Sequence, residues 1–389
     1  MRVPAPLARV WSSTPGRHLT IGLVGLVLVL VLVTSVGEFR AGQLAALAYL
    51  GIAAGGLTVL TGLNGQLSLG HGAFMAIGAY TAAVLLRLDA APPIGVVLLG
   101  SLVVATAVGA VVGVAAARLH GPYLAGATLA LAVAVPGLAI AWSGVLGGEQ
   151  GLRVAVPEVP AWFADTVFFL TATDPSRTRY FSYLAWFCLV IVFVLLANLA
   201  SSRVGRRWAA VRDDEVAAEL AGIDLGRARV LAFVVSAACA GVAGGLMALV
   251  VRLTAPSGFT LTLSLTLVTA IVLGGLGSLS GALVGAALLT VLPQFVTRLG
   301  GGLGLSDVQS AELAPLVYGV VMILVILLAP AGLVGSLRLW WMRRRLTRAA
   351  ATEAQSTGRG TTSSHRPHDP DTSATDPEAV TTSHPRRSS

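Results

Sequence analysis

Residues 203–230 read RVGRRWAAVRDDEVAAELAGIDLGRARV and lie between two long apolar segments. The stretch holds six arginines and five acidic residues, in a chain that otherwise carries little charge. Its spacing fits a short amphipathic helix. A charged, partly helical connection between two apolar segments predicts two membrane-spanning helices joined by a loop in water. Such a loop on the inner side is a natural place for a second protein to dock.

The composition as a whole agrees with a membrane protein. Hydrophobic residues make up 55% of the chain and charged residues only 11%, whereas soluble domains carry about 25% charged residues. The mean hydropathy is +0.82. The 45 glycines suit helices that pack closely through small residues. The net charge of +8 lies in loops and tails, so we expect no binding to nucleic acid.

Apolar segments recur along the chain at lengths that suit a hydrocarbon core of ~30 Å, which takes roughly 20 residues to cross. We therefore predict an all-α polytopic membrane protein with about ten transmembrane helices. The predicted spans are 19–36, 42–62, 72–88, 93–117, 122–142, 181–201, 229–251, 261–274, 281–297 and 313–333. They form one transmembrane domain over 19–335, which contains the charged loop at about 202–228.

Orientation follows from the arginines, because short cytoplasmic loops collect positive charge. Most arginines fall on one side if residues 1–18 are a cytoplasmic N-terminus, so we expect both termini in the cytoplasm. Residues 336–389 are predicted to form a basic anchor, with Trp340 and Trp341 before an arginine cluster, and a disordered cytoplasmic tail. The long outside connection, 143–180, is predicted to hold a short interfacial helix.

Several kinds of chemistry are excluded by what the chain lacks. All 26 basic residues are arginine, and a nucleotide-binding P-loop needs a lysine for the phosphates. Any ATP that drives this protein must therefore be hydrolysed by another polypeptide. Cys188 and Cys239 lie in apolar spans and are interpreted as packing residues. No cluster of His, Cys, Asp or Glu has metal or nucleophile spacing, so we predict no catalytic residue, no metal and no bound cofactor.

A glycine-rich segment at 62–74 interrupts the apolar pattern with four polar side chains. Irregular backbone at membrane depth is tolerated only where protein buries it or it lines a wet cavity. We interpret the segment as a broken or re-entrant element that lines a substrate path; the alternative is a tight cytoplasmic turn. The candidate pathway residues here are Asn64, Gln66, Ser68 and His71.

A second glycine-rich segment, 273–282, has a similar character and adds Ser278 and Ser280 as candidate pathway residues. The alternative is close helix packing through glycine. Both segments fall on the cytoplasmic side in the predicted topology.

Within the charged loop, acids precede good helix formers and a glycine follows them, which predicts a compact helix of about two turns. Small alanines would let this helix sit in a partner's groove. The alternative is an ordinary charged loop that obeys the orientation rule. The candidate docking residues are Arg212, Asp213, Asp214, Glu215, Ala217, Ala218 and Gly222.

Three motifs together resemble a known family. GLNGQLSLGHGAFMAIGAY (62–80), RLHGPYLAGATLA (118–130) and GGLGSLSGALVGA (274–286) are similar, in order and spacing, to LivM-type permease subunits of bacterial branched-chain amino-acid ABC importers. The resemblance covers about residues 40–335. The family's loop motif EAAxxxG is matched by VAAELAG (216–222), with Glu215 one residue before the usual glutamate position.

The resemblance implies a non-enzymatic transport subunit in the bacterial cell membrane. Its implied partners are ABC ATPase subunits that use ATP, a second, LivH-type permease subunit, an extracytoplasmic solute-binding protein, and membrane lipid. The loop from Arg212 to Gly222 would couple to the ATPase. The implied substrate is a branched-chain amino acid, although related permeases carry urea or short amides.

Two other classes of function stay open from the residues alone. An ATP-independent secondary transporter or channel usually carries ionisable residues deep inside its spans, and none is evident here. A membrane-embedded enzyme would need a catalytic cluster, which the chain does not show.

Overall fold

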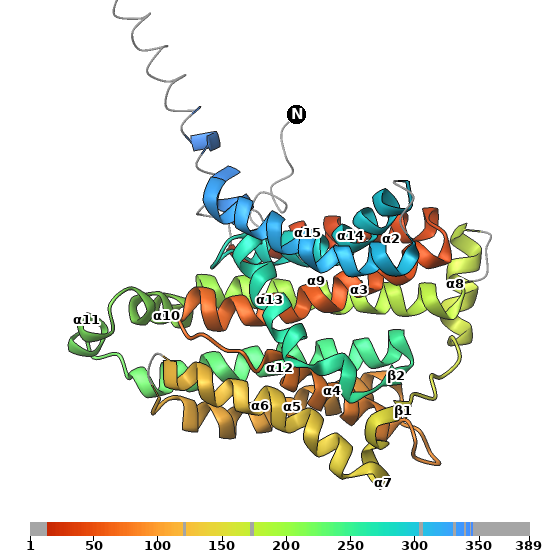
Figure 1. Cartoon of the computed structure of the whole chain (residues 1–389), viewed down its shortest axis with the longest axis horizontal. Helices are drawn as coiled ribbons and strands as arrows, with labels where there is room; N and C mark the ends of the chain where they lie inside the picture. The colour runs from red at the N-terminus through yellow and green to blue at the C-terminus, as the bar shows by residue number, and fades with distance from the viewer. Residues whose placement is uncertain are drawn as a thin grey trace, which may run out of the picture. The chain divides into compact units, whose positions relative to one another are not determined.

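The computed structural model describes residues 14–119, 122–171, 175–302, 306–329, 332–337, 340–342 and 344. Its membrane-length and shorter α-helices follow one another with few other elements (Figure 1). The α-helices are α2 (Thr14–Ser35), α3 (Glu38–Leu57), α4 (His71–Leu85), α5 (Ile94–Ala116), α6 (Pro122–Ala141), α7 (Ser143–Leu146), α8 (Ala161–Thr171), α9 (Arg177–Ser201), α10 (Arg203–Asp213), α11 (Glu215–Leu220), α12 (Leu225–Val251), α13 (Leu261–Gly274), α14 (Leu279–Gly302) and α15 (Asp307–Leu328). The remaining elements are a π-helix, η1 (Thr58–Leu63), the 3-10 helices η2 (Gly148–Gln150) and η3 (Pro256–Phe259), and the strands β1 (Leu152–Arg153) and β2 (Leu253–Thr254).

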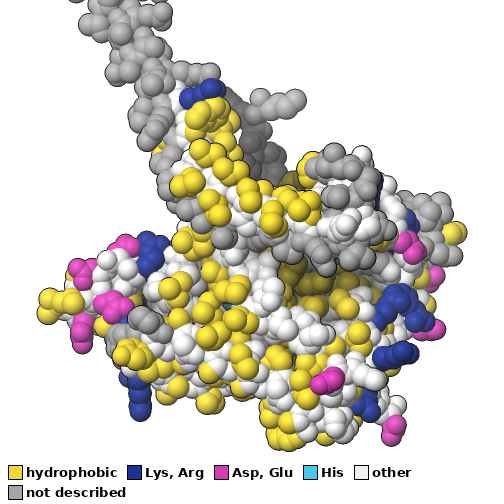
Figure 2. All heavy atoms as spheres, viewed as in Figure 1, with side chains coloured by type: hydrophobic (Ala, Val, Ile, Leu, Met, Phe, Trp, Pro, Cys, Tyr) yellow, Lys and Arg dark blue, Asp and Glu magenta, His cyan; other side chains and the backbone are white. Residues whose placement is uncertain are grey.

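Helices occur at all of the predicted spans, which confirms an all-α polytopic membrane protein. Among the described residues, 8 helices are long and apolar enough to cross a membrane. The two other predicted spans are occupied by α4, which has only 15 residues, and by α15. Figure 2 shows charged side chains gathered at the two ends of the helices, with hydrophobic side chains between them. That distribution is the one a bilayer requires.

The core forms around α3 and α12. In the spans that contain α3 and α12, 72% and 67% of the most apolar stretch is buried inside the protein, against 6% in the span of α2. Helix α12 packs most extensively on α5, α4 and α3. α2 lies on α9, and α15 lies on α14. Among the described helices, α3, α12 and the shorter α4 are therefore largely enclosed by protein, and hydrophobic side chains of the surrounding helices face outward.

Glycine and alanine bring α12 unusually close to its neighbours. A Cβ added to Gly244 would lie 1.9 Å from the backbone oxygen of Met75 on α4. A Cβ on Gly78 of α4 would lie 2.1 Å from the backbone oxygen of Gly241. Close approach of this kind is how membrane helices gain packing energy, because lipid supplies no hydrophobic drive between them.

The predicted outside connection is ordered around a small antiparallel sheet. Leu152 of β1 pairs with Thr254 of β2, directly after α12. The helix expected in 143–180 is present as α8. Figure 1 places α8, β1 and β2 at the opposite end of the helices from α10 and α11, which agrees with the predicted placement of the two loops on opposite sides.

The C-terminal predictions fall largely outside the described residues. Residues 339–389 form a separate unit, in which the guanidinium of Arg344 lies 3.7 Å from the centroid of the Trp340 ring. Residues 1–13 and 345–389, which hold most of the predicted cytoplasmic N-terminus and the predicted disordered tail, lie outside the part of the chain that the structure describes.

The close contact between α12 and α4 yields a test. We expect Gly244→Val to lower the thermal unfolding midpoint of the detergent-solubilised protein, because overpacking a close contact costs about 1–3 kcal/mol or more. The control is Gly126→Val on α6, where an added Cβ meets nothing within 4 Å. An unchanged midpoint for Gly244→Val would contradict the described packing.

Candidate functional site

The first glycine-rich segment leaves helical geometry before it reaches α4. Helix α3 ends in the π-helix η1, and π-turns often mark functional positions in membrane and soluble helices. The backbone N–H of Asn64 then donates to the oxygen of Val59, at 3.1 Å, and that of Gln66 donates to the oxygen of Leu60, at 3.1 Å. Residues 65–70 continue without a helix. Gly65 adopts a φ of +82°, which a residue with a side chain rarely tolerates.

The chain then turns back into the helix bundle. His71, the first residue of α4, lies 2.9 Å through Nε2 from the backbone oxygen of Ala53, and 3.4 Å through Nδ1 from the hydroxyl of Ser236. Ala53 lies about 15 Å along α3 from the end of η1, at ~1.5 Å per residue. Helix α4 therefore begins at depth, and Figure 1 shows the coil leading from beside α10 to α4 in the interior. We call residues 64–70 the re-entrant stretch.

The polar side chains of this segment are all buried. Asn64, Gln66, Ser68 and His71 are at most 6% exposed. Gln66 Nε2 donates to Asn64 Oδ1 and to the backbone oxygen of Arg229, the latter at 3.2 Å. Asn64 Nδ2 and Gln66 Oε1 are buried without a partner in the described structure. An unpaired buried polar atom costs about 1–3 kcal/mol, so these two atoms are candidates to meet a ligand or water.

The second glycine-rich segment is built differently. Helix α13 ends at Gly274 and α14 begins at Leu279, with only a tight turn between them. A Cβ on Gly274 would lie 1.8 Å from the oxygen of Gly281. The structure therefore shows two helices that are joined by a turn and packed closely through glycine, which is the alternative reading of this segment. The role of Ser278 and Ser280 in a substrate path stays a prediction.

The two serines of that turn lie at the start of α14. The hydroxyls of Ser278 and Ser280 are 2.9 Å apart, and Ser278 Oγ accepts from the backbone N–H of Gly281 at 3.3 Å. This arrangement explains both hydroxyls as local contacts at a helix start. They are not brought together with the buried polar side chains of the re-entrant stretch by any hydrogen bond among the described residues.

The charged loop folds into the helices α10 and α11. Asp214 lies at the N-cap of α11, where its Oδ1 accepts from the backbone N–H of Ala217 at 3.0 Å. Gly222 follows the helix with a φ of +79°, as the sequence predicts. Trp208 on α10 is fully buried and donates from Nε1 to the backbone oxygen of Ala228 at 2.9 Å. The loop is thus fixed against α12.

The outward face of α11 differs from the sequence interpretation. Ala218 is only 3% exposed and packs against its own chain, whereas Ala217 is exposed, so only Ala217 of the two alanines lies on the outward face. Val216 and Leu220, one helical turn apart, are 69% and 85% exposed. Figure 2 shows hydrophobic side chains at this tip beside acidic and basic ones. We call Val216 and Leu220 the apolar tip of α11.

Arginines connect the loop to the re-entrant stretch. Arg212 donates from Nη1 to the backbone oxygen of Gly62 at 2.8 Å and pairs with the neighbouring Asp213 at 2.7 Å. Glu215 pairs with Arg229, with 2.6 Å between Oε1 and Nη2. Sequence reasoning assigned Arg229 only to the orientation rule, because nothing in the sequence indicates which loop arginine becomes buried.

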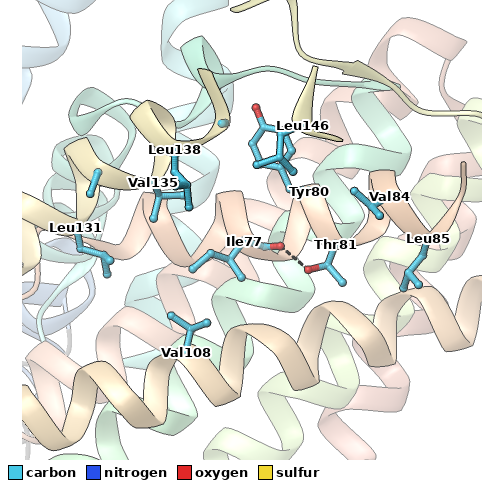
Figure 3. A pocket seen from close by; sticks show the side chains of 12 residues that line it. Ile77, Tyr80, Thr81, Val84, Leu85, Val108, Leu131, Val135, Leu138 and Leu146 are labelled. Carbon is cyan, nitrogen blue, oxygen red and sulfur yellow. Dashed lines mark hydrogen bonds between the residues drawn. The ribbon is translucent and has the colours of Figure 1, made fainter. Parts of the chain in front are cut away.

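A cavity of about 600 Å³ lies between α4, α5 and α6 (Figure 3). Its lining is almost entirely apolar. The hydroxyl of Thr81 is bonded to the backbone oxygen of Ile77 at 2.7 Å, and the hydroxyl of Tyr80 is buried without a partner among the described residues. Sequence reasoning missed this cavity, since its residues are ordinary apolar residues of predicted spans. Such a lining has too few polar groups to hold a zwitterion.

The described residues hold no group of three or more His, Cys, Asp or Glu side chains placed to bind a metal ion. Glu149 lies in the 3-10 helix η2 and is exposed. No described contact assigns it a role.

These features define a class: a multi-pass helical membrane protein with a re-entrant polar stretch and a helical loop fixed to it. The family described as "Branched-chain amino acid transport system / permease component" matches residues 40–326. The chain belongs to this family, and the resemblance inferred from its motifs is confirmed.

The curated relatives carry names from the same kind of transport system. The chain is 33% identical, over 291 residues, to the high-affinity branched-chain amino acid transport system permease protein LivM of Salmonella typhimurium, covering 72% of this chain and 66% of the relative. It is 32% identical to LivM of Escherichia coli with the same coverage. It is 26% identical to BraD of Pseudomonas aeruginosa, covering 72% of this chain and 89% of that protein.

The matched region thus spans about two thirds of the length of the LivM relatives. No solved structure matches the chain.

The contact between His71, Ala53 and Ser236 can be tested by stability. We expect His71→Ala to lower the thermal unfolding midpoint, because it removes a buried hydrogen bond, leaves unpaired groups and opens a cavity, at about 1–3 kcal/mol for the polar part alone. His18→Ala is the control, since His18 bonds Asn198 at a partly buried site on α2. Equal midpoints for the two variants would argue against a re-entrant stretch fixed at depth.

Proposed function

We propose that this chain is the permease subunit of an ABC importer in the bacterial cell membrane, and that it forms the translocation path for branched-chain amino acids. Separate ATPase subunits supply the energy, a second permease of the LivH type completes the path, and an extracytoplasmic binding protein delivers the substrate. The observation that carries the proposal is a helical loop, α10–α11, fixed to a buried polar stretch, in a chain of this family.

The energy source is assigned to another polypeptide because the chain has no lysine to build a P-loop. Its own part is then mechanical. The exposed helix α11 is the only described helix of this loop whose apolar side chains project away from the chain: Val216 and Leu220 are 69% and 85% exposed. An apolar pair in water at a helix tip is best explained by a partner that covers it.

The re-entrant stretch supports a path rather than a simple turn. The start of α4 lies at depth, where the positive end of a helix dipole favours carboxylate or other electronegative groups of a ligand. The unpaired Nδ2 of Asn64 lies in the same segment. Together they offer polar contacts to a small zwitterion, whose aliphatic side chain would need apolar surface nearby.

The substrate is assigned from the names of the relatives, and it is tested by transport. We expect cells or proteoliposomes with the full complex to take up labelled leucine, isoleucine or valine in an ATP-dependent manner, with urea and acetamide failing to compete at equal concentration. Competition by urea or acetamide would transfer the assignment to the amide-type importers of this class. Gradient-driven flux through the chain alone would instead show a secondary transporter or channel.

The apolar tip gives a sharper test of docking. We expect Leu220→Ser to weaken the association of the ATPase subunits at least about tenfold, equal to ~1.4 kcal/mol, measured by co-purification at graded concentrations. Glu219→Gln, an exposed polar change on the same helix, is the control and should bind as the natural chain does. Undiminished association of the Leu220→Ser variant would remove the tip from the docking surface.

A further inference from the structure

Arg229 occupies a junction of four separate segments. It lies on α12 and is only 5% exposed. Its guanidinium pairs with Glu215 at the start of α11, at 2.6 Å, and donates to the backbone oxygen of Ala117 after α5, at 3.4 Å. Its own backbone oxygen accepts from Gln66 Nε2 of the re-entrant stretch, at 3.2 Å. Arg229, on the core helix α12, therefore contacts α11, the end of α5 and the re-entrant stretch.

The ion pair between Arg229 and Glu215 is asymmetric in its burial, which suits a mechanical connection. The Arg229 side chain is 6% exposed, while that of Glu215 is 51% exposed. Moving α11 away would leave a buried guanidinium without its carboxylate, which is strongly unfavourable. Arg229 is therefore held to Glu215 more strongly than a surface arginine would be. A displacement of α11 would therefore pull on Arg229 and, through it, on α12.

A second contact runs beside the first. Arg212, two residues before the N-cap of α11, donates to the backbone oxygen of Gly62 at 2.8 Å, at the end of η1 just before the re-entrant stretch. The stretch is thus held at its beginning by Arg212 and at Gln66 by the backbone of Arg229. The first contact comes from the loop that carries the apolar tip, and the second comes from the residue of α12 that pairs with Glu215 of that loop.

We propose that Glu215 and Arg229 transmit the movement of α11 to the re-entrant stretch through Gln66, and so couple ATP hydrolysis to opening of the path. The inference rests on the proposed function, because it needs an ATPase to move α11. Glu215, Arg229 and Gln66 act as positioning residues, and none is required to touch substrate. Their loss separates the two activities: ATPase subunits still bind, and their hydrolysis no longer responds to substrate.

The test uses the full complex in liposomes, with the substrate-loaded binding protein added to stimulate hydrolysis. The variants are Glu215→Gln and Gln66→Met, which keep side-chain size and remove the charge or the donor. The control is Arg227→Gln, since Arg227 lies two residues from Arg229 on the same helix and its side chain is 90% exposed in its pair with Asp224. Co-purification of ATPase subunits, unstimulated hydrolysis and stimulated hydrolysis are measured for each.

We expect both variants to lose about 5-fold or more of the stimulation, measured per bound ATPase subunit and relative to the unstimulated hydrolysis of the same variant, which is the usual size of coupling between sites. The double variant should lose no more than the larger single loss, because residues in one line of contacts are not additive. Arg227→Gln should match the natural chain. Uptake of leucine should fall in parallel with stimulation.

Three results would overturn the inference. Normal stimulation in Glu215→Gln and Gln66→Met would show that the contacts transmit nothing. Losses that multiply in the double variant would show two independent effects. Loss of ATPase co-purification in Glu215→Gln would make the pair part of docking alone. Failure of the natural chain itself to bind ATPase subunits or support uptake would instead overturn the proposed function, so the two failures are distinguishable.

Discussion

The structure depends on one constraint: a backbone that leaves helical geometry inside a bilayer must find every hydrogen-bond partner within the protein. The re-entrant stretch meets this constraint by drawing on several elements. The N–H of Leu69 donates to the hydroxyl of Thr128 on α6, and that of Gly72 donates to the hydroxyl of Ser264 on α13. A hydroxyl placed at the right depth on each neighbour is what allows α4 to begin there.

The same constraint explains the crowding around α12. Partners can reach the re-entrant stretch only if the helices that bear them come close, and close approach requires positions without side chains. Helix α12 supplies them in Gly241, Gly244 and Gly245, which face α4 and α5. Arg229 lies in the second turn of α12, so one helix both encloses the polar stretch and holds the loop at its end. Packing and transmission are therefore properties of the same element.

Sequence reasoning located the helices well, because span length and apolar composition are set by the bilayer itself. It also identified the segment of Asn64 and Gln66, since polar and glycine residues inside an apolar pattern are hard to explain otherwise. It could not distinguish that segment from the one around Ser278, which has a similar composition and forms a tight turn. The difference depends on long-range contacts, His71 with Ala53 above all, and these leave no local pattern.

For α11 as well, sequence reasoning predicted some features of the structure and missed others. Its caps were predictable, because Asp214 and Gly222 act on neighbouring residues. The direction of its faces was not, since six residues have too few turns for a clear apolar stripe. The burial of Ala218 is settled by how α11 packs on the rest of the chain.

The contact between Gly62 and Gly277 restricts how the chain can rearrange. A Cβ on Gly62 would lie 2.3 Å from the backbone nitrogen of Gly277, so main chain meets main chain with no side chain between them. If the two segments slid past each other at this contact, no change of side-chain rotamer could relieve the clash. The end of η1 and the turn between α13 and α14, far apart in the sequence, consequently shift together as one body, and any hinge must lie elsewhere in the molecule.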